Sequence, residues 1–182
     1  PVRRYVSRMA AEKNLKLVAR GFHRLLQSQT HSQAVWVGDG PEKARCERDH
    51  PAFVYAGMRR DRELARHYAS GDLFIFPSIT ETFGNVVTEA MASGLVVVAY
   101  DYAAPHLYIR DGENGFLAPF NDDDAFLAAV DRALDARERW PEIRRNARQT
   151  AEGLTWDAIV CHFANTLAEA VNARGFSPHP TA

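Results

Sequence analysis

Residues 73–94 read LFIFPSITETFGNVVTEAMASG, and this stretch decides the expected fold. The apolar run Leu73–Phe76 predicts a strand, and the spacing of apolar side chains in residues 86–91 predicts a helix. A polar turn with a carboxylate at Glu81 joins them, and a second carboxylate, Glu89, lies within the helix. A strand, a polar turn and a helix N-terminus form the usual place where an open α/β sheet holds an anionic ligand.

Strand-like and helix-like patterns alternate through the rest of the chain, with no break in composition. Further strands are predicted at residues 3–6, 34–37, 53–57, 95–99 and 116–117. Further helices are predicted at residues 12–27, 41–49, 61–69 (capped by Asp61), 103–109, 125–134, 141–152 and from residue 156 onward. This alternation predicts one α/β domain over residues 1–174, a Rossmann-like doubly wound parallel sheet, followed by a disordered tail at residues 175–182.

Composition excludes several classes of protein. The chain has 182 residues and a formal net charge of −1, so it lacks the basic excess of a nucleic-acid binder, and we expect no nucleic-acid partner. Its longest apolar run, residues 95–100, is far too short to cross a bilayer. Cys46 and Cys161 stand in no metal or redox spacing, which favours a reduced, cytoplasmic compartment.

Common catalytic signatures are also missing from the sequence. The seven histidines form no His-x-x-x-His pair and no Cys/His cluster, so we expect no bound metal. No Gly-x-Ser-x-Gly elbow is present, which disfavours serine-hydrolase chemistry. No phosphate loop ending in Gly-Lys-Ser/Thr is present either.

Ligands of open α/β sheets bind beyond the carboxyl ends of the strands, so the residues that follow the strands are the candidates for a site. They are Arg8, residues 38–41, residues 57–60, residues 78–85 and residues 100–106.

Gly84 and Asn85 begin the predicted helix, where free N–H groups and the helix dipole favour a phosphate. Arg8 and Lys13 could neutralise a diphosphate from the loop after the first strand. Glu89 could accept hydrogen bonds from the two hydroxyls of a ribose. Each also has a plain structural interpretation, as helix cap, surface charge or dipole-stabilising carboxylate, and none is specific alone.

The order of these residues is more specific. The pattern P-S-x-x-E-x-F-G-x-x-x-x-E-A-M-A-x-G at residues 77–94 resembles the signature of retaining GT-B glycosyltransferases, family 4 (group 1), in their C-terminal, donor-binding domain. Arg8 and Lys13 are similar to that family's phosphate-binding pair. VGDGP at residues 37–41, FVYAG at 53–57 and DGENGFL at 111–117 follow in the family's order, so the resemblance covers about residues 3–170.

The resemblance implies roles for individual residues. Arg8 and Lys13 would hold the diphosphate and Glu81 would approach the donor sugar, and these three form the expected catalytic set. Glu89 would bind the ribose. The other donor-binding residues would be Phe83, Gly84 and Asn85 beside sugar and phosphates, Met58 and Arg59 beside the base, and Gly38. No metal or other cofactor is expected, because cations and the helix end replace it.

Two departures concern the loops. Ser7 stands where the family often has glycine, and Ala103 and Ala104 stand where many members have a Gly-Gly pair followed by glutamate. Contacts from the second loop to acceptor or donor sugar are therefore open. His106 lies in that loop and is either a ligand contact or a half-buried loop histidine.

The resemblance implies transfer of a hexose from a UDP- or GDP-linked sugar to a glycolipid or cell-envelope polysaccharide. TETFGNV at residues 80–86 is similar to members with mannose or glucose donors. The acceptor-binding half would precede this chain and is absent, so we expect the chain alone to bind donor without transferring sugar. We expect no direct membrane contact from this half, in a cytoplasmic protein that is peripheral at the inner membrane face through the missing half.

Two alternatives remain open from the sequence. One is a non-catalytic nucleotide-sugar-binding module or partner subunit. The other is a different GT-B enzyme, such as an epimerase or a phosphorylase, although the absence of a pyridoxal-phosphate lysine motif counts against a phosphorylase.

Overall fold

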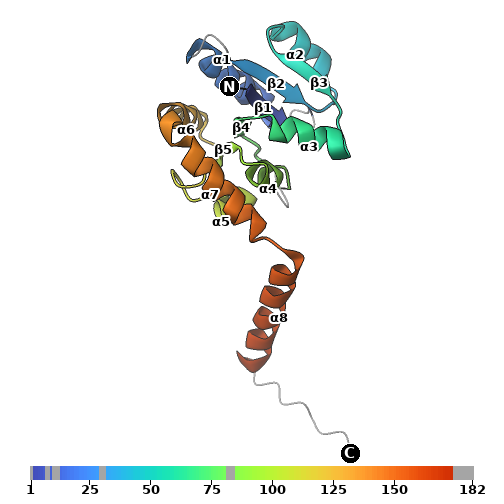
Figure 1. Cartoon of the computed structure of the whole chain (residues 1–182). Coiled ribbons are helices and arrows are strands. Elements are labelled where there is room, and N and C mark those ends of the chain that lie inside the picture. Colours follow the sequence, from blue (N-terminus) through green and yellow to red (C-terminus); the bar gives the residue numbers. More distant parts are fainter. Residues whose placement is uncertain (1, 7–8, 10–12, 29–31, 81–84, 174–182) are drawn as a thin grey trace, which may run out of the picture. The chain divides into compact units, whose positions relative to one another are not determined.

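The computed structural model describes residues 2–6, 9, 13–28, 32–80 and 85–173 (Figure 1). Six strands form one parallel sheet in the order β3-β2-β1-β4-β5-β6. The strands are β1 (Val2–Val6), β2 (Gln33–Val37), β3 (Val54–Gly57), β4 (Leu73–Phe76), β5 (Val96–Tyr100) and β6 (Phe116–Ala118). The helices are α1 (Leu15–Ser28), α2 (Lys43–Asp49), α3 (Asp61–Ala69), α4 (Asn85–Ala92), α5 (Ala103–Tyr108), α6 (Asp123–Asp135), η2 (Arg137–Arg139), α7 (Trp140–Glu152) and α8 (Trp156–Ala173).

The predicted doubly wound α/β sheet is confirmed, and the predicted elements are present with boundaries that differ by a few residues. The predicted cap of α3 is wrong. Asp61 is the first residue of that helix and has a positive φ of 46°, and Arg60 occupies the N-cap position without a side-chain hydrogen bond. The chain turns sharply between these two residues, so the Asp61 carboxylate has no part in capping. At α6 the expected acidic cap is present, because Asp122 accepts a hydrogen bond from the Ala125 N–H at 2.9 Å.

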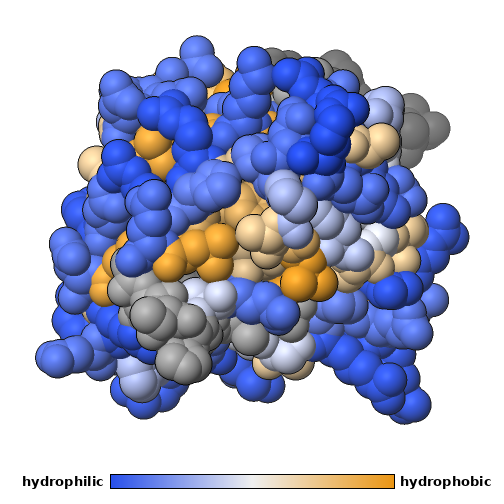
Figure 2. All heavy atoms as spheres, turned by 90° about the horizontal axis from the view of Figure 1, so that it is seen from above, coloured by the Kyte–Doolittle hydropathy of each residue, from blue (hydrophilic) through white to orange (hydrophobic). Residues whose placement is uncertain are grey.

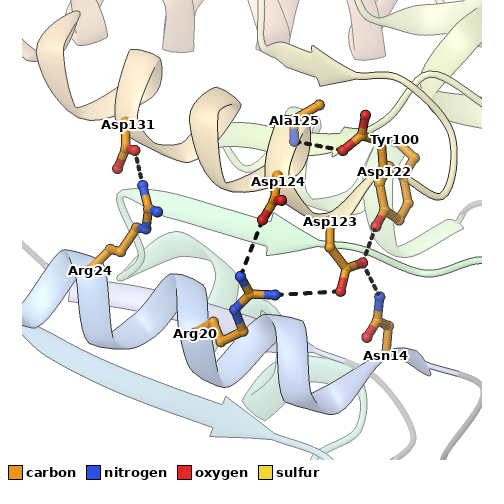
Figure 3. Close-up of polar contacts among 9 residues, drawn as sticks. All are labelled: Asn14, Arg20, Arg24, Tyr100, Asp122, Asp123, Asp124, Ala125 and Asp131. Atoms are coloured by element: carbon orange, nitrogen blue, oxygen red, sulfur yellow. Dashed lines mark hydrogen bonds and ion pairs between the residues drawn. The ribbon is translucent and has the colours of Figure 1, made fainter.

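The middle of the sheet is the centre of the core. Every side chain of β4 and β5 is buried, which requires helices on both faces of these strands. On one face α1 lies beside α6, and Figure 3 shows their charged side chains pointing toward one another. Arg20 lies 3.5 Å from Asp123 and 3.4 Å from Asp124, and Arg24 pairs with Asp131.

The carboxyl edge of the sheet exposes apolar side chains. Figure 2 shows apolar atoms in a band across one face of the molecule, bordered by hydrophilic side chains. Large exposed apolar residues within residues 1–151 are Val54, Met58, Ile79, Tyr102, Leu107 and Phe120. Four of these follow a strand within three residues, after β3, β4, β5 and β6 respectively. Exposed apolar side chains gathered among polar ones mark surfaces that bind something.

Residues 152–182 form a second compact unit, separate from residues 1–151. Its described part is α8, whose apolar side chains Val160, Phe163, Leu167 and Val171 are all at least half exposed. None of the helices within the described ranges is long and apolar enough to span a membrane. Residues 174–182, which include the predicted tail, lie outside the described residues.

Candidate functional site

The site expected from the sequence surrounds the place where the strand order reverses. In the strand order, β1, β2 and β3 follow one another toward one edge of the sheet, and β4, β5 and β6 follow one another toward the other edge. Strands β1 and β4 are neighbours, with Arg3 paired to Leu73 and Arg4 to Phe74. The strand order therefore reverses between β1 and β4, and ligands of doubly wound folds bind beyond the carboxyl ends of the strands at such a reversal.

Lys13 connects the segment after β1 to the segment after β4. Its Nζ donates to Oγ of Ser78 at 3.3 Å and to the carbonyl oxygen of Thr80 at 3.0 Å. Ser78 is buried and its hydroxyl donates to the same carbonyl at 3.2 Å. The sequence places Lys13 after β1 and Ser78 and Thr80 after β4, so the contact brings together two segments far apart in the chain. A positive charge is thus held directly before the segment that begins at Glu81.

The loops after β1, β2 and β3 are also joined to one another. The N–H of Gly38 donates to the Gly57 carbonyl oxygen at 2.9 Å, and the Met9 N–H donates to that of Asp39 at 2.9 Å. A Cβ at Gly40 would lie 2.3 Å from the Met9 carbonyl oxygen, far inside contact distance. Only glycine permits this close approach of two backbones. The strand-end loops therefore form one continuous row with Lys13 near its middle.

Met58 and Arg59, the expected neighbours of the base, directly follow β3 in this row. Met58 is 53% exposed, which is unusual for so apolar a side chain and leaves its surface available for stacking. The guanidinium of Arg59 lies 3.8 Å from the Glu63 carboxylate one turn into α3. The structure therefore brings Gly38, Met58 and Arg59 together at the ends of β2 and β3.

Glu89 lies on the exposed side of α4, four residues after Asn85 begins the helix. The hydroxyl of Tyr68, from α3, is buried against it. Burial and then the negative charge of Glu89 raise the pKa of Tyr68, so this hydroxyl stays protonated. Within the described part of the chain this hydroxyl has no hydrogen bond of ordinary geometry, so its contact with Glu89 is electrostatic. The buried Tyr68 hydroxyl and the exposed Glu89 carboxylate are therefore neighbours on α3 and α4.

Four predicted site residues, Arg8, Glu81, Phe83 and Gly84, lie outside the described residues. The sequence did not assign roles to Ser78 and Tyr68. Ser78 had a usable signal, because it is a polar residue directly after the apolar strand β4 and its Pro77. Tyr68 had none, since its spacing from Leu64 on α3 is that of an ordinary core residue.

The loop after β5 keeps the backbone of a glycine-bearing turn. Ala103 has a positive φ of 51°, a conformation that costs an alanine about 1 kcal/mol relative to glycine. The alanine thus stands in a conformation that suits the glycine many resembling proteins have there. His106, from the same loop, has Nδ1 2.7 Å from Oδ1 of Asp101. Its side chain is 66% exposed, which rules out the half-buried alternative.

Within the described ranges, no group of three or more His, Cys, Asp or Glu side chains could hold a metal ion. A hollow of about 520 Å³ lies between the start of α1 and α2, lined by Asn14, Leu15, Lys16, Glu42, Arg45, Cys46, Asp49 and His50. Its lining holds two carboxylates, Glu42 and Asp49, and two cationic side chains, Lys16 and Arg45.

Comparison with known proteins agrees with this geometry. The family model for glycosyl transferases group 1 matches residues 1–136. The chain belongs to the group 1 glycosyltransferases. It is 36% identical over 179 residues to a GDP-mannose-dependent alpha-mannosyltransferase of Mycobacterium tuberculosis, covering 96% of this chain and 44% of that protein. It is 35% identical over 167 residues to the sulfoquinovosyl transferase SQD2 of Arabidopsis thaliana, covering 88% of this chain and 32% of that protein.

This group 1 glycosyltransferase chain thus spans less than half the length of these curated relatives. Solved structures agree on the fold. The pneumococcal O-GlcNAc transferase GtfA, solved with UDP and GlcNAc, superposes with a TM-score of 0.76 at 22% identity, over 93% of this chain and 36% of that one. The Anabaena protein HepE, solved with UDP, superposes with a TM-score of 0.72 at 24% identity, over 92% and 48%. The Rossmann-like sheet is therefore that of GT-B glycosyltransferases.

Proposed function

We propose that this chain is the donor-binding half of a retaining glycosyltransferase that moves a hexose from a nucleotide-diphosphate sugar to a glycolipid or polysaccharide acceptor. The observation that carries this proposal is the contact of Lys13 with Ser78 and Thr80, which holds a cation over the reversal of strand order. In a group 1 glycosyltransferase, a cation at this position can neutralise the diphosphate of the bound donor.

Lys13 has a defined electrostatic task in the reaction. When the bond between sugar and diphosphate breaks, negative charge develops on the departing phosphate oxygen. A cation held at that position stabilises this charge more in the transition state than in the ground state, which lowers the barrier. Helix α4 begins at Asn85. The positive end of a helix dipole lies at the helix N-terminus, so the start of α4 favours an anion as well. Arg8 is the second cation of this proposal.

Glu89 is assigned to the ribose. It is exposed on α4, and its negative charge would repel a phosphate but can accept hydrogen bonds from two neighbouring hydroxyls. The buried Tyr68 lies close enough for the Glu89 charge to raise the pKa of its hydroxyl. The exposed side chain of Met58 then supports the base, since it follows β3 on the same edge of the sheet. Glu81 completes the proposal as the contact to the donor sugar.

We further propose GDP-mannose as the donor. Support comes from three relatives at 32–36% identity that are GDP-mannose-dependent alpha-mannosyltransferases, from Mycobacterium tuberculosis, Corynebacterium glutamicum and Mycolicibacterium smegmatis. The acceptor would be held together with a second domain, since the relatives are more than twice as long as the matched region. The chain alone is then expected to bind donor and to transfer no sugar.

Calorimetric titration of the 182-residue chain with GDP, UDP and ADP tests the proposal. GDP should bind most tightly, and Glu89→Ala should weaken it by about 1–3 kcal/mol because hydroxyls lose their partner. Glu47→Ala, which removes an exposed carboxylate from α2, is the matched control and should leave binding unchanged. If no nucleotide binds, or if both variants bind GDP as the wild type does, the proposed site is wrong.

A non-catalytic nucleotide-sugar-binding module is the second candidate. It predicts the same nucleotide affinity but no turnover in any context. The two are separated by incubating the full-length protein that contains this chain with GDP-mannose and a membrane lipid extract. Release of GDP together with a mannosylated lipid supports the enzyme, and its absence at full donor occupancy supports the module.

A further inference from the structure

The side chain of Asp123, the first residue of α6, reaches the residue that follows Lys13. Its Oδ1 accepts a hydrogen bond from Nδ2 of Asn14 at 3.3 Å and another from the Tyr100 hydroxyl at 3.0 Å. Its Oδ2 lies 3.5 Å from the Arg20 guanidinium on α1. Figure 3 shows these three side chains turned toward the carboxylate. Asp123 therefore joins the start of α1, the end of β5 and the start of α6.

Asn14 is the junction between Lys13 and α1. Its backbone has a positive φ of 51°, a conformation that few residues other than glycine adopt and that asparagine tolerates better than most. Its carbonyl oxygen accepts hydrogen bonds from the N–H groups of Leu17 at 3.0 Å and Val18 at 3.2 Å, which begin the hydrogen bonding of α1. The direction in which the chain carries Lys13 away from the helix therefore depends on the placement of Asn14.

The carboxylate end of this link is held by core packing. Tyr100, the last residue of β5, is 1% exposed, and its ring packs edge to face on Phe126 of α6 with centroids 5.0 Å apart. Burial and then the hydrogen bond to Asp123 raise the pKa of Tyr100, so its hydroxyl stays protonated and donates to the carboxylate. The Asp123 carboxylate is therefore a well-placed acceptor for the Asn14 amide.

Lys13 is consequently held at both ends. Its Nζ donates to Ser78 and to the Thr80 carbonyl oxygen after β4, and its backbone continues directly into Asn14. The lysine ammonium is carried on a flexible four-carbon stem, so a fixed backbone narrows the positions open to it. We propose that Asp123 is a positioning residue, which acts through Asn14 to fix the place of Lys13, the cation for the donor diphosphate. The diphosphate rests on the proposed function, whereas the link to Lys13 rests on the hydrogen bonds of Asn14.

The neighbouring Asp124 offers a close comparison. It has the same charge and nearly the same place on α6, but its carboxylate lies 3.4 Å from Arg20 and its side chain is 94% exposed. Both aspartates stand in the first turn of α6, where a negative charge suits the helix dipole. Substitutions at the two positions therefore share the loss of the dipole interaction and of an ion pair with Arg20. They differ in the contacts of Asp123 with Asn14 and Tyr100.

Selective 13C labelling of lysine tests the link by NMR, because the chain has only three lysines, Lys13, Lys16 and Lys43. In the wild type, the ε-methylene signal of Lys13 should differ from that of the exposed Lys16, because the Lys13 ammonium is held. Asp123→Ala should move the Lys13 signal toward that of Lys16. Asp123→Asn keeps an oxygen acceptor and should restore most of the wild-type position. Asp124→Ala is the matched control and should leave the Lys13 signal unchanged.

GDP calorimetry measures the consequence for the ligand. Asp123→Ala should weaken GDP binding about two- to tenfold, the value of one hydrogen bond, and should weaken GMP binding less. In a Lys13→Ala background, the same substitution should cause no further loss of GDP affinity, which a general effect on the fold would not produce. Asp124→Ala should bind GDP as the wild type does.

Several outcomes would overturn the inference. A Lys13 signal that stays in place in Asp123→Ala, or that moves equally in Asp124→Ala, means that Asp123 does not position this lysine. A loss of GDP affinity that persists in full in the Lys13→Ala background means that Asp123 acts by another route. A wild type that binds no GDP contradicts the proposed function, and the lysine spectra then still decide whether Asp123 fixes the place of Lys13.

Discussion

Replacing Lys13 with alanine tests the centre of the site, because it removes one cation and two hydrogen bonds. Its Nζ donates to Ser78 and to the Thr80 carbonyl oxygen in the free chain. That carbonyl keeps a partner in the variant, since the Ser78 hydroxyl also donates to it at 3.2 Å. We therefore expect the free energy of unfolding to fall by no more than about 1 kcal/mol.

The effect on ligand binding should be larger. A hydrogen bond from a charged donor to a phosphate contributes about 1.5–3 kcal/mol, so GDP affinity should fall about 10- to 150-fold. GMP lacks the second phosphate, so its affinity should fall less than that of GDP in the Lys13→Ala variant. Calorimetry with both nucleotides measures the difference, and Lys16→Ala, an exposed lysine three residues further along α1, is the matched control.

Two outcomes would refute this reasoning. If Lys13→Ala binds GDP within a factor of two of the wild type, no diphosphate contacts this cation. If GDP and GMP lose affinity equally, Lys13 shapes the loop and has no direct part in holding the diphosphate. The loss should also shrink as salt is added, because ions screen an exposed cation.

Three further changes test the surroundings of the site. Gly40→Ala should lower the free energy of unfolding by about 1–3 kcal/mol and weaken GDP binding, because its Cβ would overlap the backbone of Met9. Tyr68→Phe should weaken GDP binding about two- to tenfold in calorimetry, because the Tyr68 hydroxyl lies beside Glu89. The free energy of unfolding should stay nearly constant, because this hydroxyl has no ordinary hydrogen bond within the described residues. Burial and then the charge of His23 lower the pKa of His50 below its usual 6.5, so the folded state favours the neutral imidazole. Stability from this group is present above pH 6.5 and is lost as pH falls through the lowered pKa, and urea unfolding between pH 7.5 and 5 should show a smaller loss in His50→Gln.

Each of these has its own control. Gly112→Ala also places alanine at a positive φ but meets no atom within 4 Å, so it should cost less than Gly40→Ala. Tyr55→Phe removes a hydroxyl remote from Glu89 and should leave GDP affinity intact. For the histidine, an unchanged pH profile in His50→Gln would mean that other groups control the acid limb, and His67→Gln on α3 is the comparison.

The sequence predicted the fold well because each central strand is a short apolar run between turn residues. Residues 95–99 allow no other assignment, and the structure buries every side chain of β5. The sequence predicted that Lys13 and the loop after β4 lie at the same edge of the sheet, but it did not predict their contact. Spacing along a chain indicates which loops share an edge and does not indicate which atoms meet. Tyr68 and Glu89 come from different helices, and no periodicity relates two helices to one another. The α3 cap failed because a carboxylate at a helix start looks the same in sequence whether it precedes or begins the helix.

The distribution of charge along the sheet edge argues for two binding regions of different chemistry. The segment after β1 carries Lys13, whose charge favours a diphosphate. The end of β5 carries Asp101, which a phosphate would avoid and a neutral sugar hydroxyl can use. A ligand that is anionic at one end and neutral at the other has therefore one favourable direction along this edge, with its phosphates toward β1 and its sugar toward β5.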